Sequence, residues 1–323
     1  MPTAVQVTKI GGPEVLTVAE VEVGDPGPRE LLVDVAAAGV NYIDTYHRSG
    51  IYPIPLPFVL GMEGAGTVAA VGGEVTEFAP GDRVAWQGSI GSYAQRKLVP
   101  ADIAVKVPDG VSDELAAATL LQGVTAHYLV TSTYEVKPGD DILVHAAAGG
   151  VGLLLVQLAK ARGARVIGTV STAEKEQLAR EAGADDVIRY DDVDFAEATR
   201  KLTGGEGVSV VYDGVGKSTV DGSLASLKPR GLLALFGAAS GPVPPIDPLQ
   251  LLKGGSLYLT RPTTGDYVHT REERDWRANE LFDAVLDGSL NIRVGGRYPL
   301  ADARQAHEDL QGRKTTGKLL LIP

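Results

Sequence analysis

The sequence has no cysteine, a shortage of positive charge and no long apolar run. Because none of its 323 residues is cysteine, disulfides, thiolate nucleophiles and cysteine-ligated metal sites are excluded. Lys and Arg number 30 against 41 Asp and Glu, a net charge of -11, which argues against nucleic acid and anionic membranes as partners. No stretch approaches the roughly 20 apolar residues of a spanning helix, and Met1–Gly12 does not resemble a signal peptide. We therefore expect a cytoplasmic protein.

The pattern of elements predicts two domains, which the chain length also favours. The first third alternates short apolar runs such as Leu31–Ala37 with Gly/Pro turns, which is typical of β-rich structure. From Asp140 onward strands alternate with helices, which predicts a doubly wound parallel sheet. The segments after Arg261 are too few to form a core of their own. We predict an α/β fold in which a Rossmann-type domain (125–261) is inserted in a discontinuous β-rich catalytic domain (1–124 and 262–323).

A dinucleotide fingerprint lies at the start of the α/β part. The predicted strand Ile142–Ala146 is followed by a turn and then by an amphipathic helix from Gly150. Ala147, Gly149 and Gly152 occupy the three glycine positions of the fingerprint, the first with alanine. This strand–turn–helix context is the one that the motif requires. We expect a dinucleotide diphosphate at this turn, contacted by Gly149, Gly150, Val151 and Gly152.

The residues beyond the second predicted strand favour NADPH over NADH. NAD sites place a carboxylate about 20 residues past the glycines, whereas this chain has Ser171 there. A hydroxyl can donate to a 2′-phosphate that a carboxylate would repel. Lys175 and Tyr190 are expected at the same corner. The alternative for Lys175 is a solvated helix lysine beside Glu174 and Glu176.

Several motifs resemble the zinc-free quinone oxidoreductases of the medium-chain dehydrogenase/reductase superfamily. They are Gly39–Asp44, Leu60–Val68, Gly81–Val84 and Ala146–Gly152, with Phe236-Gly237, Ser256–Pro262 and Gly317–Leu320 later in the chain. The alcohol dehydrogenases of this superfamily have a zinc-ligating cysteine where Asn41 stands and a histidine where Met62 stands. The resemblance therefore implies a GroES-like catalytic domain without a metal. It also implies hydride transfer from NADPH to a small conjugated carbonyl compound such as a quinone, which needs less polarisation than an alcohol or isolated ketone.

The same resemblance implies a set of site residues. Asn41, Tyr46 and Tyr52 are the candidate catalytic residues, and Asn41 would also contact the cofactor. Further cofactor contacts are expected from Gln122, Thr125, Phe236, Gly237, Ser240 and Arg313. Alternatives stay open: an ordinary turn asparagine for Asn41, and anchors of the Gly/Pro-rich loop Arg48–Pro57 for the two tyrosines.

Neighbouring polar residues are expected to have structural or solvated roles and not catalytic ones. Glu63 is expected to hold backbone amides and Asp44 to cap a local helix. His47 is interpreted as a solvated loop histidine and Lys318 as a surface charge.

Two other functions and one assembly also follow from the sequence. The first alternative is reduction of an enone or alkenal double bond on the same fold, and the second is a non-catalytic crystallin-like or RNA-binding role. The apolar edge strand Ser256–Thr260 would be prone to aggregate if left bare. We expect it to pair with its counterpart in a homodimer.

Overall fold

The computed structural model describes all residues, Met1–Pro323. The chain forms two compact units, Met1–Val124 with Val268–Pro323 and Thr125–Tyr267. The second boundary lies after Tyr267, six residues beyond residue 261, where the sequence predicts it. The reason is that Tyr267 stacks on Tyr128 with ring centroids 4.2 Å apart and accepts a hydrogen bond from Thr133 at 2.9 Å. Residues 262–267 therefore pack with the second unit.

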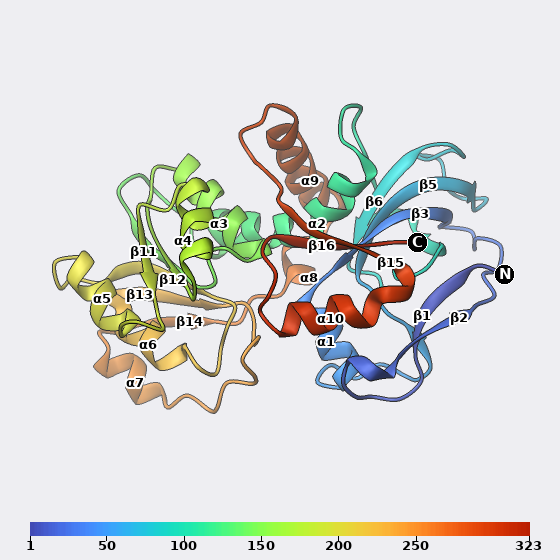
Figure 1. The fold of residues 1–323 in the computed structure, drawn as a ribbon. Helices are drawn as coiled ribbons and strands as arrows, with labels where there is room; N and C mark the ends of the chain where they lie inside the picture. Colours follow the sequence, from blue (N-terminus) through green and yellow to red (C-terminus); the bar gives the residue numbers. More distant parts are fainter. The chain divides into compact units, whose positions relative to one another are not determined.

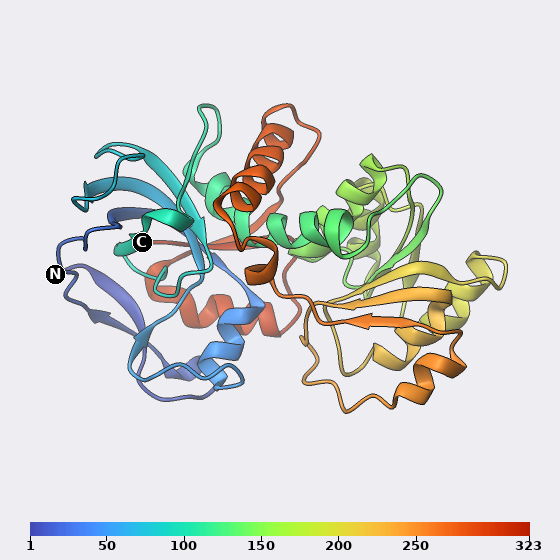
Figure 2. The same ribbon diagram turned by 180° about the vertical axis from the view of Figure 1, so that it is seen from behind.

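The first unit, the β-rich unit, is built on two sheets. The larger has the order β15-β16-β3-β5-β6-β8, with β7 also paired to β3, and the smaller has the order β2-β1-β4. The C-terminal strand β16 lies beside β3 in an antiparallel pair, as Figures 1 and 2 show. This pairing makes the last residues part of the same sheet as residues 30–40. The strand bounds are β1 Thr3–Val7, β2 Leu16–Glu20, β3 Glu30–Val40, β4 Phe58–Val59, β5 Glu63–Val71, β6 Arg83–Gln87, β7 Arg96–Pro100, β8 Val105–Lys106, β15 Val294–Pro299 and β16 Lys318–Ile322.

Helices and two apolar clusters complete the β-rich unit. One cluster joins β1, β3, β16 and α10 through residues such as Val40, Tyr93 and Leu321, and the other fills the sheet around Trp86. The helices are α1 Tyr42–Ser49, α9 Arg271–Leu286 and α10 Ala303–Gln311, with short 3-10 turns at Pro13–Val15, Ala101–Ile103 and Leu300–Asp302. Helix α2 (Asp113–Tyr128) contains the boundary between the units and is followed by a π-helical turn, Leu129–Thr133.

The second unit, the α/β unit, is one parallel sheet with helices on both faces. Its strand order is β11-β10-β9-β12-β13-β14, which is the 3-2-1-4-5-6 order of doubly wound dinucleotide-binding folds. Helix α3 packs beside α4 and α5 beside α6, on opposite faces of the sheet (Figure 1). The strands are β9 Asp141–Val144, β10 Arg165–Val170, β11 Asp186–Arg189, β12 Val208–Asp213, β13 Leu227–Leu235 and β14 Tyr258–Thr260. The helices are α3 Gly150–Ala161, α4 Ala173–Glu181, α5 Phe195–Leu202, α6 Val220–Ser226, α7 Pro248–Lys253 and α8 Thr264–Tyr267.

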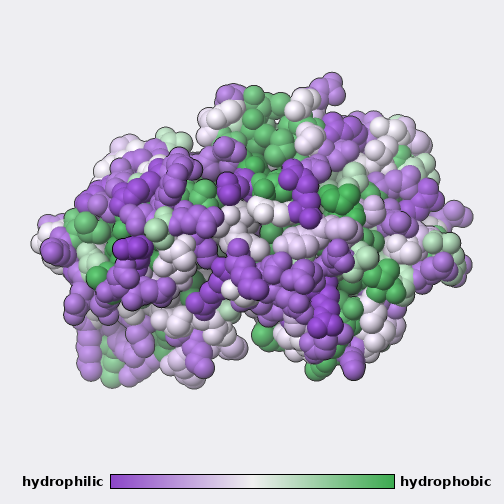
Figure 3. Space-filling view, viewed as in Figure 1, coloured by the Kyte–Doolittle hydropathy of each residue, from purple (hydrophilic) through white to green (hydrophobic).

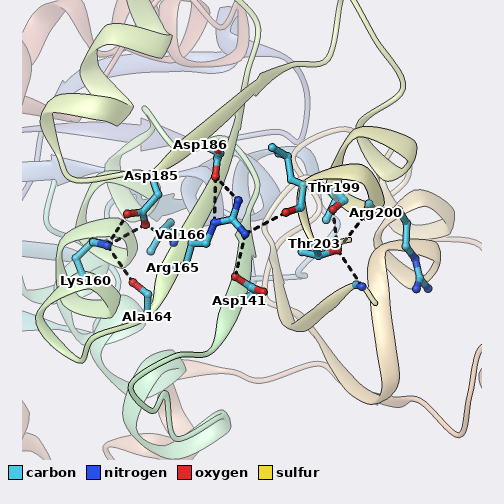
Figure 4. A network of polar contacts seen from close by, with 12 residues as sticks. Asp141, Lys160, Ala164, Arg165, Val166, Asp185, Asp186, Thr199, Arg200 and Thr203 are labelled. Carbon is cyan, nitrogen blue, oxygen red and sulfur yellow. Dashed lines mark hydrogen bonds and ion pairs between the residues drawn. The ribbon is translucent and has the colours of Figure 1, made fainter. Parts of the chain in front are cut away.

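Ion pairs join the amino ends of the first three strands of this sheet (Figure 4). Arg165, the first residue of β10, lies 2.8 Å from Asp186 at the start of β11 and 3.5 Å from Asp141 at the start of β9. Lys160 pairs with Asp185 at 2.8 Å on the same side. These side chains are roughly one-third exposed, so each pair contributes at most about 1 kcal/mol. They stabilise the edge of the sheet opposite to the carboxyl ends, where ligands bind in such folds.

The surface is mostly hydrophilic on the face shown in Figure 3. Hydrophobic residues gather there in smaller areas. None of the helices combines the length and the hydropathy that crossing a membrane requires.

Candidate cofactor and acceptor site

The turn between β9 and α3 leaves backbone amides without a side-chain cap. Gly149 is the N-cap residue of α3, and as a glycine it has no side chain with which to cap the first amides of that helix. Helices α4, α5 and α7 are capped by Thr172, Asp194 and Asp247. Because the first amides of a helix have no partner inside it, those of α3 are available to an anion, and the helix dipole favours one.

Close packing at this turn explains two of its glycines. A Cβ on Gly152 would lie 2.2 Å from the carbonyl oxygen of Ala146, so α3 could not begin where it does with any larger residue. A Cβ on Gly149 would lie 3.1 Å from the same oxygen, which is tight but close to tolerable. Ala146 itself has a positive φ of 50°. Gly152 thus serves helix–strand packing, as the fingerprint leads one to expect, and the contact of Gly149 with a diphosphate stays a prediction.

Three predicted residues gather at the corner beside this turn. Ser171 follows β10 directly, and Tyr190 follows β11. The amide of Tyr190 donates to the carbonyl of Val170 at 3.1 Å, which holds the two strand ends together. Lys175 is the third residue of α4, and its amide donates to the Thr172 hydroxyl at 3.3 Å. The fold therefore brings Ser171, Lys175 and Tyr190 to one corner at the carboxyl edge of the sheet.

A buried polar network behind the turn was missed by the sequence reasoning. His145, the residue before Ala146, has Thr169 Oγ1 at 2.8 Å from its Nδ1 and Ser223 Oγ at 3.0 Å from its Nε2. Ser223 in turn donates to Asp213 Oδ2 at 2.8 Å. Burial lowers the pKa of His145, and the Asp213 carboxylate opposes the shift. The network fixes the carboxyl ends of β9, β10 and β12 against one another.

Phe236, Gly237 and Ser240 lie where the fifth strand of this sheet ends. The amide of Phe236 donates to the carbonyl of Asp213 at 2.9 Å, and a Cβ on Gly237 would lie 2.3 Å from the carbonyl of Gly214. The Ser240 hydroxyl donates to the carbonyl of Val215 at 2.8 Å and accepts from the amide of Ser218 at 3.0 Å. This segment is thus held against the end of β12.

Thr125 and Arg313 lie outside these clusters. The Thr125 hydroxyl is 3.4 Å from that of Thr264, within the α/β unit. Arg313 follows α10 in the β-rich unit, is exposed and has a positive φ of 56°. The cofactor roles of both residues stay predictions.

In the β-rich unit, Asn41 is buried and all its polar side-chain atoms have partners. Its Nδ2 donates to Glu63 Oε1 at 2.7 Å, and its Oδ1 accepts from Lys318 Nζ at 2.9 Å and from Gln122 Nε2 at 3.2 Å. Lys318 also contacts Glu63, and Glu63 Oε2 accepts from the Leu121 amide at 2.8 Å. Glu63 therefore holds a backbone amide, as expected. We call the three buried residues Asn41, Glu63 and Lys318, together with the half-buried Gln122, the buried quartet.

The interpretation of Lys318 as a surface charge is wrong. Its exposed fraction is 1%, because it opens the strand β16, whose side chains are buried almost throughout. Burial lowers the pKa of Lys318 to about 7, and the Asp44 carboxylate opposes that shift.

The interpretation of His47 as a solvated loop residue is also wrong, and Tyr46 is not in the loop. Both lie in α1 and are buried, with 8% and 9% of their surface exposed. The Nδ1 atom of His47 is buried without a hydrogen-bond partner, and burial lowers the pKa of this histidine. Tyr52, which is 40% exposed, packs edge-on against Tyr46 with ring centroids 5.4 Å apart, and its centroid lies 6.1 Å from that of His47. The two candidate tyrosines therefore form one aromatic cluster with His47.

Asp44 caps α1, as expected from the sequence. Its Oδ2 accepts from the Asn41 amide and from the Tyr93 hydroxyl, both at 2.8 Å. Tyr93 lies 3.2 Å from His307 Nε2, and Arg48 lies 2.8 Å from His307 Nδ1. Because arginine can only donate, Nδ1 of His307 accepts, and its Nε2 carries the proton toward Tyr93. Burial raises the pKa of Asp44 to about 6, and the hydrogen bonds from the Asn41 amide and from Tyr93 oppose that shift.

Nowhere in the chain do three or more His, Cys, Asp or Glu side chains come together in a way that could hold a metal ion. At the two positions where the family resemblance implies the zinc ligands of alcohol dehydrogenases, the chain has Asn41 and Met62.

A dinucleotide-binding sheet interposed in a β-rich domain is the architecture of medium-chain dehydrogenases/reductases. The sequence matches two families of this class, the one described as "Alcohol dehydrogenase GroES-like domain" over residues 27–109 and "Zinc-binding dehydrogenase" over residues 150–277. Together with full-length relatives at 47–48% identity that are named quinone oxidoreductases, they show that the chain belongs to the quinone oxidoreductases of this superfamily.

Three relatives are informative. A mycobacterial protein solved in complex with NADPH is 55% identical, with a TM-score of 0.97 and full coverage of both chains. The quinone oxidoreductase of Escherichia coli, also solved with NADPH, is 47% identical over 99% of this chain and 100% of its own, with a TM-score of 0.98. A 2-haloacrylate reductase from Burkholderia is 45% identical over 100% of this chain and 99% of its own.

Proposed function

We propose that the protein is an oxidoreductase that uses NADPH to reduce quinones. The observation that carries this proposal is the uncapped glycine turn at the carboxyl end of β9, with Ser171 at the end of β10 and no carboxylate at that position. The NADPH complexes of the mycobacterial and Escherichia coli relatives support it. NADPH, when bound, supplies the hydride.

The α/β unit would hold the cofactor through its backbone and one corner of side chains. The first amides of α3, from Gly150 to Gly152, donate to the diphosphate. Ser171 donates to the 2′-phosphate, and Lys175 and Tyr190 complete that corner. Asp213 and His145 act behind the turn, since they fix the strand ends on which it is built.

The β-rich unit would provide the acceptor side. Tyr46 and Tyr52 offer an aromatic surface on which a quinone ring can stack, and Tyr52 is accessible. A quinone that gains a hydride becomes a delocalised anion and needs one proton to become a hydroquinone. Positioning is therefore the chief contribution of the protein, and no strong Lewis acid is required. The proposed roles of Asn41, Gln122, Thr125, Phe236, Gly237, Ser240 and Arg313 as cofactor contacts rest on the family resemblance.

A second candidate function is reduction of an activated carbon–carbon double bond. The likeness to the Burkholderia 2-haloacrylate reductase favours it, since 2-haloacrylate carries a double bond conjugated to a carboxylate. The cofactor site would be the same, and only the acceptor would differ.

One experiment separates these functions. The purified protein is given NADPH with a benzoquinone, with 2-chloroacrylate or with an alkenal, and the products are identified. We expect the quinone to give the highest kcat/KM. A higher kcat/KM with either alkene would favour the second candidate, and no binding in an NADPH fluorescence titration would revive the non-catalytic alternative.

We also propose that the protein is a homodimer paired through β14. This strand is the last of its sheet, so its outer edge has no partner within the chain. Tyr258 in this strand is 62% exposed, and Leu249 and Leu252 of α7, the helix that precedes it in the chain, are 54% and 66% exposed. Pairing with a second copy would satisfy the edge and cover these side chains. The cytoplasmic location stays a prediction from the sequence.

A further inference from the structure

Three members of the buried quartet, Asn41, Glu63 and Lys318, lie at the ends of neighbouring strands, and the fourth, Gln122, lies in α2. In the antiparallel pair of β16 and β3, Leu319 faces Val40, so the next pair in that register is Lys318 and Asn41. In the pair of β3 and β5, Ala38 faces Gly64, which places Glu63 opposite Gly39. The register alone therefore brings an ammonium, a carboxamide and a carboxylate side by side.

This arrangement leaves no room for movement. Asn41, Glu63 and Lys318 are 3%, 0% and 1% exposed. A Cβ on Gly39 would lie 2.3 Å from Glu63 Oε1, so only glycine permits the carboxylate at this place. A buried charge without a partner is costly. Lys318 and Glu63 neutralise each other, and each also bonds to Asn41.

The hydrogen bonds fix which way the Asn41 carboxamide points. Lysine only donates and a carboxylate only accepts. The Asn41 oxygen must therefore face Lys318, and its nitrogen must face Glu63, as observed. A flipped carboxamide would put its NH2 group against the ammonium and its oxygen against the carboxylate.

Asn41 is also the N-cap residue of α1, which carries Tyr46 and leads to Tyr52. Its amide donates to Asp44 in the first turn of that helix. Besides its proposed contact with the cofactor, Asn41 therefore sets the start of α1, and its side chain is held in place by bonds inside the protein. The quartet thereby connects β16, close to the C-terminus, to the aromatic cluster.

We propose that Lys318 is a positioning residue for the acceptor site, acting through Asn41 and the first turn of α1 on Tyr46 and Tyr52. This inference rests on the proposed function, because the reaction provides its readout. Lys318 itself touches no substrate. Its effect should fall on the quinone side, because the contacts proposed at the glycine turn belong to the other unit. Asn41 and Gln122, which are also proposed cofactor contacts, keep their bond to each other without Lys318.

The test compares two buried lysines of the β-rich unit. Lys318→Met removes the ammonium from the quartet. Lys97→Met is the matched control. Lys97 lies in β7, away from the quartet, is 6% exposed, and donates to Ser89 and to the carbonyl of Ile90. Both variants are assayed for kcat and KM with a benzoquinone, for NADPH dissociation constant by fluorescence, and for thermal unfolding.

We expect Lys318→Met to raise the KM for the quinone and to lower kcat/KM by roughly ten- to a hundredfold, the range for loss of one charged hydrogen bond. Its NADPH dissociation constant should stay within twofold of wild type. Lys97→Met should lose stability without a change in quinone KM. An unchanged quinone KM in Lys318→Met, or an equal rise in Lys97→Met, would overturn the inference.

A second variant covers the case in which Lys318→Met does not fold. In the double variant Glu63→Gln/Lys318→Met no buried charge lacks a partner, so stability should recover while the quinone KM stays raised. Wild-type kinetics in the double variant would mean that the quartet is structural only. If wild-type protein itself fails to reduce the quinone, the proposed function fails, and the NADPH titration distinguishes that result from failure of this inference.

Discussion

Substituting the two glycines of the turn separates packing from cofactor binding. In Gly152→Ala the new Cβ would meet the Ala146 carbonyl oxygen at 2.2 Å, so α3 must move by roughly 1 Å to restore an ordinary contact. Overpacking of this kind costs about 1–3 kcal/mol of unfolding free energy. Gly149→Ala meets the same oxygen at 3.1 Å with φ of -78° and ψ of 173°, a conformation that alanine adopts freely. Its stability should stay within about 1 kcal/mol of wild type.

For Gly149→Ala, NADPH binding should be affected more than stability. The methyl group of Gly149→Ala would project where the diphosphate approaches the backbone, so NADPH affinity should fall at least tenfold although the fold is intact. Urea unfolding gives the stability, and NADPH fluorescence titration gives the dissociation constant. A suitable control is Arg165→Met, which removes the ion pairs at the opposite edge of the sheet and should leave NADPH affinity unchanged. If Gly149→Ala bound NADPH as wild type does, the turn would not be the diphosphate site.

Three further predictions concern specificity, acid stability and assembly. Ser171→Asp should shift the ratio of kcat/KM for NADPH over NADH at least tenfold toward NADH, and an unchanged ratio would exclude the proposed 2′-phosphate contact. Burial lowers the pKa of His307 to about 3 from an ordinary 6.5, so its contribution to stability is present above pH 6.5 and is lost as the pH falls toward 3. Between pH 7 and pH 4.5 wild type should therefore lose about 2–3 kcal/mol more than His307→Gln in urea unfolding, and equal losses would contradict this assignment. Tyr258→Arg should sediment as a monomer at micromolar concentration while Val193→Arg, at an equally exposed apolar residue (52%), stays dimeric.

Local pattern was sufficient to predict the α/β unit. Apolar strands that alternate with helices predict a doubly wound parallel sheet, and a glycine turn in the right context places Ser171 near the expected cofactor corner. The order of the strands was not predicted and comes from the structure. The edge strand was predicted too long: β14 spans only Tyr258–Thr260, because Ser256 has a positive φ and ends the preceding turn.

The buried polar residues could not be predicted in the same way. Lys318 and Glu63 are 255 residues apart in sequence, and only the register of β16, β3 and β5 brings them together. Nothing local distinguishes a lysine that opens a buried strand from one that lies on the surface. His47 was missed for a related reason: a helix was expected at Asp44, but the polar segment beside a Gly/Pro-rich loop does not show that this helix extends to Ser49 and buries His47.

The most direct test of the proposed function is a single-turnover reaction under anaerobic conditions. Protein that has been treated with a metal chelator is mixed with one equivalent of NADPH and then with a benzoquinone, and absorbance and products are followed together. We expect one hydroquinone to form for each NADPH oxidised, at the same rate with and without chelator. NADPH that stays reduced, or a reaction that requires an added metal ion, would contradict it.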